Sequence, residues 1–156
     1  MSGGGILMDH GWHSLYLAYN WFEENPVEVQ SRLHRPEPDA AEDEVTLKIR
    51  FPSGEATIFL TWNAGLRRNR MRLVGECGEI VIDDDILKVG GESIRFDPAL
   101  SSGSYHDDWF AAMLPDIVAA IRSPETAMPT LSEAAFCLQV IQRAYQRNCA
   151  SAGETA

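Results

Sequence analysis

The chain is short of positive charge, and this shortage excludes two classes of partner. Thirteen lysines and arginines stand against 23 aspartates and glutamates, which gives a net charge of -10 at pH 7. A surface with this excess of negative charge repels phosphate backbones and anionic membranes. We therefore expect no nucleic-acid partner and no membrane partner.

Cysteine is also scarce, and long apolar runs are missing. The three cysteines, Cys77, Cys137 and Cys149, are odd in number and form no C-x-x-C pair, which argues against a disulfide framework or a zinc–thiolate site. No segment approaches the ~20 apolar residues that span a bilayer. The first residues also lack the basic and apolar regions of a signal peptide. These absences predict a cytoplasmic protein.

The hydrophobic pattern changes its period twice along the 156 residues. From about Asp9 to Phe22 apolar residues recur at three- and four-residue steps, as in a helix with one buried face. From Val27 they alternate, as in half-buried strands, and after residues 100–104 the helical period returns. This order predicts an α+β fold, a mainly antiparallel sheet of about six strands with helices packed on one face.

The same pattern sets the predicted boundaries. We expect one α+β domain over residues 1–150 and a disordered tail over 151–156. The acidic run 37–44 is typical of a solvated loop. Phe59, Val74 and Val81 fall on the sheet face opposite the helices, and an exposed apolar face usually marks an interface. We therefore predict a homo-oligomer joined through the sheet, with this face free for association.

The first thirteen residues carry the strongest chemical signal. A run of three glycines (residues 3–5) leads into Asp9, Gly11 and His13. If a helix starts at or just after Asp9, the spacing of four places the carboxylate and the imidazole on one face, where they can do proton chemistry. A simpler interpretation is that Asp9 caps the helix and that His13 is structural.

The opening string closely resembles the C-terminal domain of the glucose-fructose oxidoreductase and inositol dehydrogenase family (Gfo/Idh/MocA). A meander with Gly75-Glu76-x-Gly78 and a later helix opened by Tyr105-His106-Asp107-Asp108-Trp109-Phe110 add to the resemblance, which extends from Gly3 to about Ala150. Members of that family have an N-terminal Rossmann domain that binds NAD or NADP. Their C-terminal α+β domain supplies substrate contacts and the oligomer interface.

The resemblance implies roles for four residues. His13 would be the catalytic acid/base for a sugar or polyol hydroxyl, and Asp9 would be its catalytic partner. Trp12 and His106 would line the substrate pocket. The glycines before them would let the backbone pass close to the nicotinamide and the substrate.

A Rossmann domain is not evident in this sequence. No strand leads into a G-x-G-x-x-G turn, and residues 3–5 have no strand before them. The family's catalytic lysine lies in a Glu-Lys-Pro motif, whereas the two lysines here, Lys48 and Lys88, fall in predicted strands and adjoin no proline. We expect NAD or NADP only in an intact two-domain protein with a Rossmann partner, and no cofactor and no catalysis by this chain alone.

Two departures from the family pattern keep alternatives open. Many members have aspartate where this chain has Tyr16, and His10 is unusual at its position. One alternative is a non-catalytic homo-oligomeric scaffold or small-ligand binding module. Another is a metal site built from Asp9, His10, His13 and His106. Because His10 should point away from Asp9 and His13 by about 100° per residue, we predict no metal.

Overall fold

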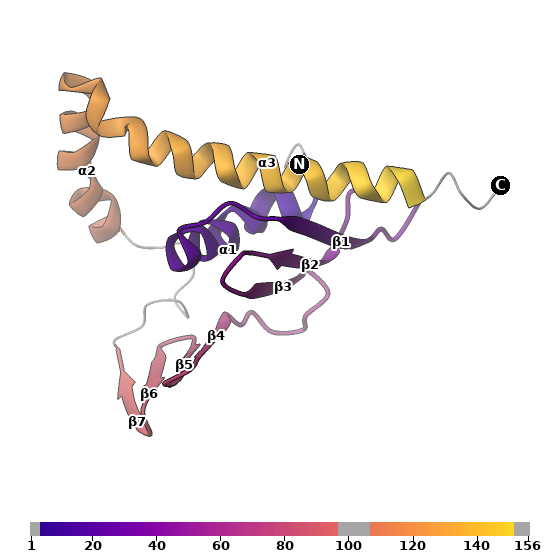
Figure 1. Ribbon diagram of the computed structural model, residues 1–156, viewed down its shortest axis with the longest axis horizontal. Helices are drawn as coiled ribbons and strands as arrows, with labels where there is room; N and C mark the ends of the chain where they lie inside the picture. Colours follow the sequence, from indigo (N-terminus) through magenta and orange to yellow (C-terminus); the bar gives the residue numbers. More distant parts are fainter. Residues whose placement is uncertain (1–3, 97–106, 152–156) are drawn as a thin grey trace. The chain divides into compact units, whose positions relative to one another are not determined.

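The computed structural model describes residues 4–96 and 107–151 (Figure 1), without the side chains of residues 107, 126–130 and 147–151. It forms two compact units, one of Met1–Asn63 with Ser123–Ala156 and one of Ala64–Arg122. Within the described ranges no helix is long and apolar enough to cross a membrane. The elements in chain order are α1 (Ile6–Phe22), β1 (Glu28–His34), β2 (Glu44–Arg50), β3 (Glu55–Thr61), β4 (Arg70–Gly75), β5 (Gly78–Asp83), β6 (Ile86–Val89), β7 (Glu92–Arg95), α2 (Asp107–Arg122), the 3-10 helix η1 (Pro124–Ala127) and α3 (Met128–Ser151).

The α+β class and the antiparallel pairing are confirmed, but the strands form two sheets. The first sheet has the order β1-β2-β3 and the second the order β4-β5-β6-β7, with every neighbouring pair antiparallel. We predicted about six strands in one sheet. The first ladder stops at residues 63–69, where asparagine and glycine interrupt the alternation. The predicted single domain over residues 1–150 stays a prediction, and the tail residues 152–156 lie outside the described ranges.

The core belongs to the first unit and lies between its sheet and two helices. Val45, Leu47 and Ile49 point to one face of β2 because strand side chains alternate. On that face α1 contacts β2, β3 and α3, and α3 contacts β1, so the helices form a layer over the sheet (Figure 1). The buried apolar residues are Ile6, Leu7, Leu15, Ala18, Val29, Val45, Leu47, Ile49, Phe51, Phe136, Cys137, Val140, Ile141 and Ala144.

Helix α1 packs closely on the sheet at Gly11. A Cβ atom there would lie 2.7 Å from Leu7 Cδ1 and 3.8 Å from Leu60 Cδ1, so the glycine of the opening motif leaves room for the core. The helix ends at Phe22. Glu23 then takes a left-handed conformation with φ 51°, and its N–H donates to the Tyr19 carbonyl at 2.8 Å.

The second unit contains a meander whose two faces differ in polarity. Gly90 and Gly91 have φ values of 57° and 87° in the turn between β6 and β7, which fits the glycine preference of tight hairpins. At the end of β5, the Arg68 guanidinium donates two hydrogen bonds to the Asp83 carboxylate, at 2.8 and 2.7 Å. Paired residues of antiparallel strands share a face, and the apolar face carries Met71, Leu73, Ile80, Ile82, Leu87, Val89 and Ile94.

The register separates the three residues that we placed on one apolar sheet face. Phe59 lies in the first sheet, on its outer face, and is 58% exposed. Val74 and Val81 belong to the second sheet, where Val81 pairs with Arg72 and Lys88 on the more polar face. These residues therefore do not line one face of a single sheet.

Candidate functional site

Helix α1 begins three residues before Asp9, and a remote glutamate caps it. Gly5 is the N-cap residue and supplies no side-chain bond. The Ile6 N–H donates to the Glu42 carbonyl at 2.9 Å, and the Leu7 N–H donates to Glu42 Oε1 at 3.2 Å. Both donors are among the four that a helix start leaves unpaired. The interpretation of Asp9 as the cap is wrong, because Glu42 has that role.

Glu42 is buried although it lies within the acidic run that we expected to be solvated. Only 2% of it is exposed, and Tyr145 Oη donates to its Oε1 at 2.7 Å. Burial raises the pKa of Tyr145, and the hydrogen bond to Glu42 raises it further. A Cβ atom on Gly5 would overlap the Glu42 carboxyl group. The glycine at this position is therefore needed to admit the carboxylate.

Asp9 and His13 both lie on α1, four residues apart and exposed. This spacing puts them on one side of the helix, as predicted. His10 Nε2 lies 3.5 Å from Asp9 Oδ2, whereas we expected His10 to point away from this face. Since Glu42 already caps the helix, the Asp9 carboxylate has no capping duty and faces solvent beside the His10 imidazole.

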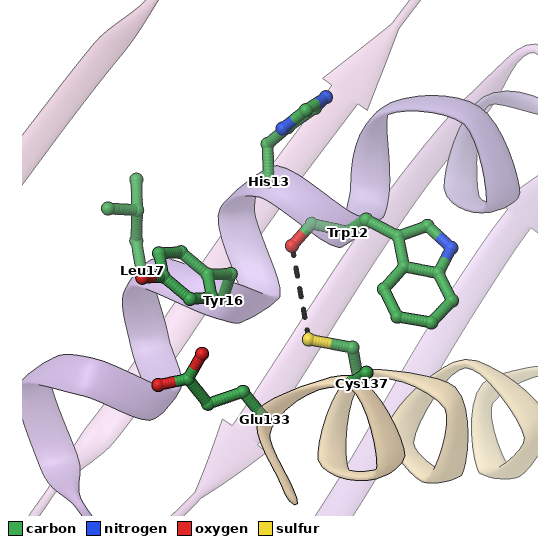
Figure 2. A pocket seen from close by; sticks show the side chains of 7 residues that line it. Trp12, His13, Tyr16, Leu17, Glu133 and Cys137 are labelled. Atoms are coloured by element: carbon green, nitrogen blue, oxygen red, sulfur yellow. Dashed lines mark hydrogen bonds between the residues drawn. The ribbon is translucent and has the colours of Figure 1, made fainter. Parts of the chain in front are cut away.

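A pocket of about 370 Å³ opens between α1 and α3 and includes two of the predicted site residues. Figure 2 shows Trp12 and His13 on α1, with Glu133 and Cys137 on α3. Tyr16 follows the apolar spacing of α1, but it is 46% exposed and lines this pocket. The residues that line it are Trp12, His13, Tyr16, Leu17, Glu133, Ala134 and Cys137.

The chemistry of this pocket favours binding over nucleophilic attack. Cys137 Sγ lies 4.0 Å from the Trp12 carbonyl, toward which it points (Figure 2). Burial raises the pKa of the Cys137 thiol, so the sulfur stays protonated and is a poor nucleophile. The two aromatic rings offer apolar walls and Glu133 adds a carboxylate, while the His13 ring points away from Glu133 and Cys137 (Figure 2). Such a lining, mostly apolar with one carboxylate, suits a small ligand with an apolar face.

The predicted pocket residue His106 lies outside the described residues. In the part of the chain that the structure covers, no group of three or more His, Cys, Asp or Glu side chains could hold a metal ion. Asp9 and His10 are the two members of the alternative metal site that are in contact.

The glycine-rich start does not fit the phosphates of a dinucleotide. Glycines followed by a helix N-terminus commonly bind phosphate through free N–H groups. Here the first N–H groups of α1 point to Glu42, and its carboxylate fills the space beside Gly5. A pyrophosphate would have to displace a buried carboxylate and would be repelled by its charge. We therefore expect no nucleotide to bind at the start of this helix.

Sequence reasoning named Asp9, Trp12 and His13 as candidates, and it missed Glu42 and the α3 side of the pocket. The bond from Leu7 to Glu42 joins residues 35 apart, and that from Tyr145 spans 103. No local spacing indicates contacts of this range. The need for glycine at the helix start is the one signal that something large lies against it.

Comparison with known protein families gives one match. The sequence model described as GFO/IDH/MocA C-terminal domain matches residues 1–81. No curated protein matches the chain significantly.

Two solved structures share the fold. One is a protein from Magnetospirillum magnetotacticum MS-1 described as an oxidoreductase, with TM-score 0.65, 22% identity and 88% of this chain covered. The other is an oxidoreductase from Thermotoga maritima, with TM-score 0.57, 20% identity and 91% covered. At these identities the likeness shows the fold alone. The chain spans about half of each structure, 47% and 43%.

Proposed function

Because this chain belongs to the GFO/IDH/MocA C-terminal domain family, we propose that it is the substrate-binding and oligomerisation domain of an NAD(P)-dependent oxidoreductase acting on a sugar or polyol. The observation that supports this most is the placement of Asp9 and His13. Both are exposed one turn apart on α1, while a different carboxylate, that of Glu42, caps the helix. Neither side chain is buried or caps the helix, so both are available for chemistry.

In this proposal His13 is the acid/base. Its imidazole takes the proton of a substrate hydroxyl, a task that suits a group titrating near neutrality. Asp9 orients that hydroxyl and stabilises the positive charge that develops on the imidazole. Trp12 supplies an apolar wall beside His13 in the pocket, and His106 remains a second proposed substrate contact.

The nucleotide is held elsewhere. It would supply the hydride acceptor. Among the described residues, the glycine-rich start of α1 offers no phosphate site, because the Glu42 carboxylate occupies it. We propose that a Rossmann partner binds NAD or NADP and that the chain by itself does not catalyse.

For the oligomer we propose a second copy of this chain joined through a sheet face. The apolar face of the second sheet supports this, because Ile80, Val89 and Ile94 are 39%, 44% and 48% exposed. Apolar surface of this kind is commonly covered by association. Sedimentation at micromolar concentration should show an oligomer, and a monomer alone would count against the proposal.

The proposed chemistry is tested by His13→Ala and Asp9→Ala in a reconstituted two-domain protein. Because both side chains are exposed, the melting temperature should stay within a few degrees of the wild type. Turnover should fall by about 10²-fold or more for His13→Ala, the range of a lost general base. Asn20→Ala, an exposed residue later on the same helix, is the matched control. Full turnover in His13→Ala would contradict the assigned role.

The same experiment separates the alternative, a non-catalytic scaffold or small-ligand binding module. The pocket between α1 and α3 favours it, since binding alone needs no cofactor. Polyol binding that depends on Trp12, without turnover in any two-domain form, is the result that this alternative predicts.

A further inference from the structure

We propose that Glu42 is a positioning residue for Asp9, the proposed partner of His13, a role that rests on the proposed function. Its carboxylate is a buried acidic side chain, 2% exposed, in the same unit as the candidate site. It lies just before β2, far along the chain from the motif that it contacts.

Glu42 is held from two sides. From α1 it receives the Leu7 N–H on Oε1 at 3.2 Å and the Ile6 N–H on its carbonyl at 2.9 Å. From α3 it receives the Tyr145 hydroxyl on the same Oε1 at 2.7 Å. A carboxylate with two donors on one oxygen has little freedom to move. It therefore ties the start of α1 to α3 and to the approach to β2.

These contacts of Glu42 hold the backbone of Asp9 in place through Gly5. The Asp9 N–H donates to the Gly5 carbonyl at 3.1 Å, so the backbone of Asp9 is fixed by the residue that packs directly against Glu42. A negative charge at a helix start also favours the helical first turn. Without the Glu42 carboxylate the Leu7 N–H would lose its partner, while the Ile6 N–H would keep the backbone carbonyl of residue 42. The first turn would then fray.

The two members of the pair should respond differently. Asp9 lies in the first turn, whereas His13 lies one turn deeper, between the buried residues Gly11 and Leu15. Loss of Glu42 should therefore free Asp9 and leave the His13 backbone in place. A general loss of core packing would affect the whole helix alike.

Hydrogen exchange on the full 156-residue chain tests this difference. In Glu42→Ala the backbone amides of Leu7 and Asp9 should exchange about tenfold or more faster than in the wild type. The exchange rate of the Ala18 amide should not change. Glu42→Gln should restore much of the protection, because its amide oxygen still accepts both bonds. Tyr145→Phe should give an intermediate loss, and Glu44→Gln, a neighbouring carboxylate on β2, should change nothing.

Kinetics of the reconstituted two-domain protein give the second readout. Glu42→Ala should lower kcat by about tenfold or more with KM nearly unchanged, as expected when a group that acts mainly in the transition state is misplaced. A wild type without turnover would contradict the proposed function. An active wild type whose Glu42→Ala variant keeps full kcat, or loses protection along all of α1, would contradict the positioning role alone.

Discussion

At the scale of single residues, Gly5 and Glu42 depend on each other. A Cβ atom at position 5 would overlap the Glu42 carboxyl group and its carbonyl oxygen. Gly5→Ala must therefore push Glu42 out of its bonds with Leu7 and Tyr145. We expect this change to lower the free energy of unfolding by about 2 kcal/mol or more.

Chemical denaturation followed by tryptophan fluorescence measures this loss. Gly65→Ala is the control, because no atom lies within 4 Å of a Cβ built there, and its cost should stay within about 0.5 kcal/mol. Equal effects of the two substitutions would mean that Glu42 yields easily to the new methyl group.

Single residues also show where sequence reasoning reaches its limit. The shared helix side of Asp9 and His13 was predictable because a spacing of four has a direct meaning on a helix. Glu42 was not, since it lies among acidic residues and acquires its role only through a contact 35 residues away. The resemblance implied that the glycines let the backbone approach the nicotinamide and the substrate. In the structure, Gly5 makes room for Glu42 and Gly11 makes room for Leu7 and Leu60.

At the scale of elements, strand boundaries were more predictable than helix faces. Alternation and turn residues mark the strands β4 to β7 in the sequence, because both signals are local. The side of α3 that is buried differs from the side that its leucines indicate. Leu131 and Leu138 follow the apolar helical spacing but are 58% and 40% exposed, while Phe136 is 5% exposed. A helix with apolar residues on two sides buries the side that meets the sheet, which its own sequence does not specify.

The end of α1 offers a simple gain in stability. Glu23 has φ 51°, a conformation that costs a residue with a Cβ atom about 1 kcal/mol and that glycine adopts freely. Glu23→Gly should raise the free energy of unfolding by about 0.5–1 kcal/mol. Glu23→Ala, which keeps the Cβ atom, should give no such gain in the same denaturation measurement. A lower stability of the glycine variant would contradict this account of the cap.

The ends of the first three strands are joined by an acid-sensitive cluster. Asp43 accepts a 2.8 Å bond from His34 Nδ1 and a 3.0 Å bond from Asn63 Nδ2. These bonds, that to His34 first, hold the pKa of Asp43 below its ordinary value of 3.8. A lowered pKa stabilises the fold above the ordinary value, and the benefit is lost as pH falls through the folded-state value.

Thermal melts at several pH values test this cluster. The stability advantage of the wild type over Asp43→Asn should be present at about pH 6 and should shrink as pH falls below about 4. Glu37→Gln, in the same acidic run, should show no such change. An advantage that grows on acidification would have the wrong sign for this explanation.

At the scale of the whole molecule, the sequence predicted the α+β class but not the division into two sheets. Each strand pattern shows only that its own side chains alternate, and alternation continues across a break between sheets. For that reason Phe59, Val74 and Val81 were assigned to one surface although they belong to two sheets. Oligomerisation remains a proposal that the apolar face of the second sheet supports.

The central claim is that this chain handles substrate while another part of the protein handles the nucleotide. The Glu42 carboxylate at the start of α1 fills the place where the glycines would otherwise admit a phosphate. The most direct test is a calorimetric titration of NAD and NADH into the purified chain, with its mass measured by light scattering in the same buffer. The account predicts a stable oligomer that releases no heat of binding. Micromolar binding of either nucleotide would contradict it and would show that the glycine-rich start takes the cofactor after all.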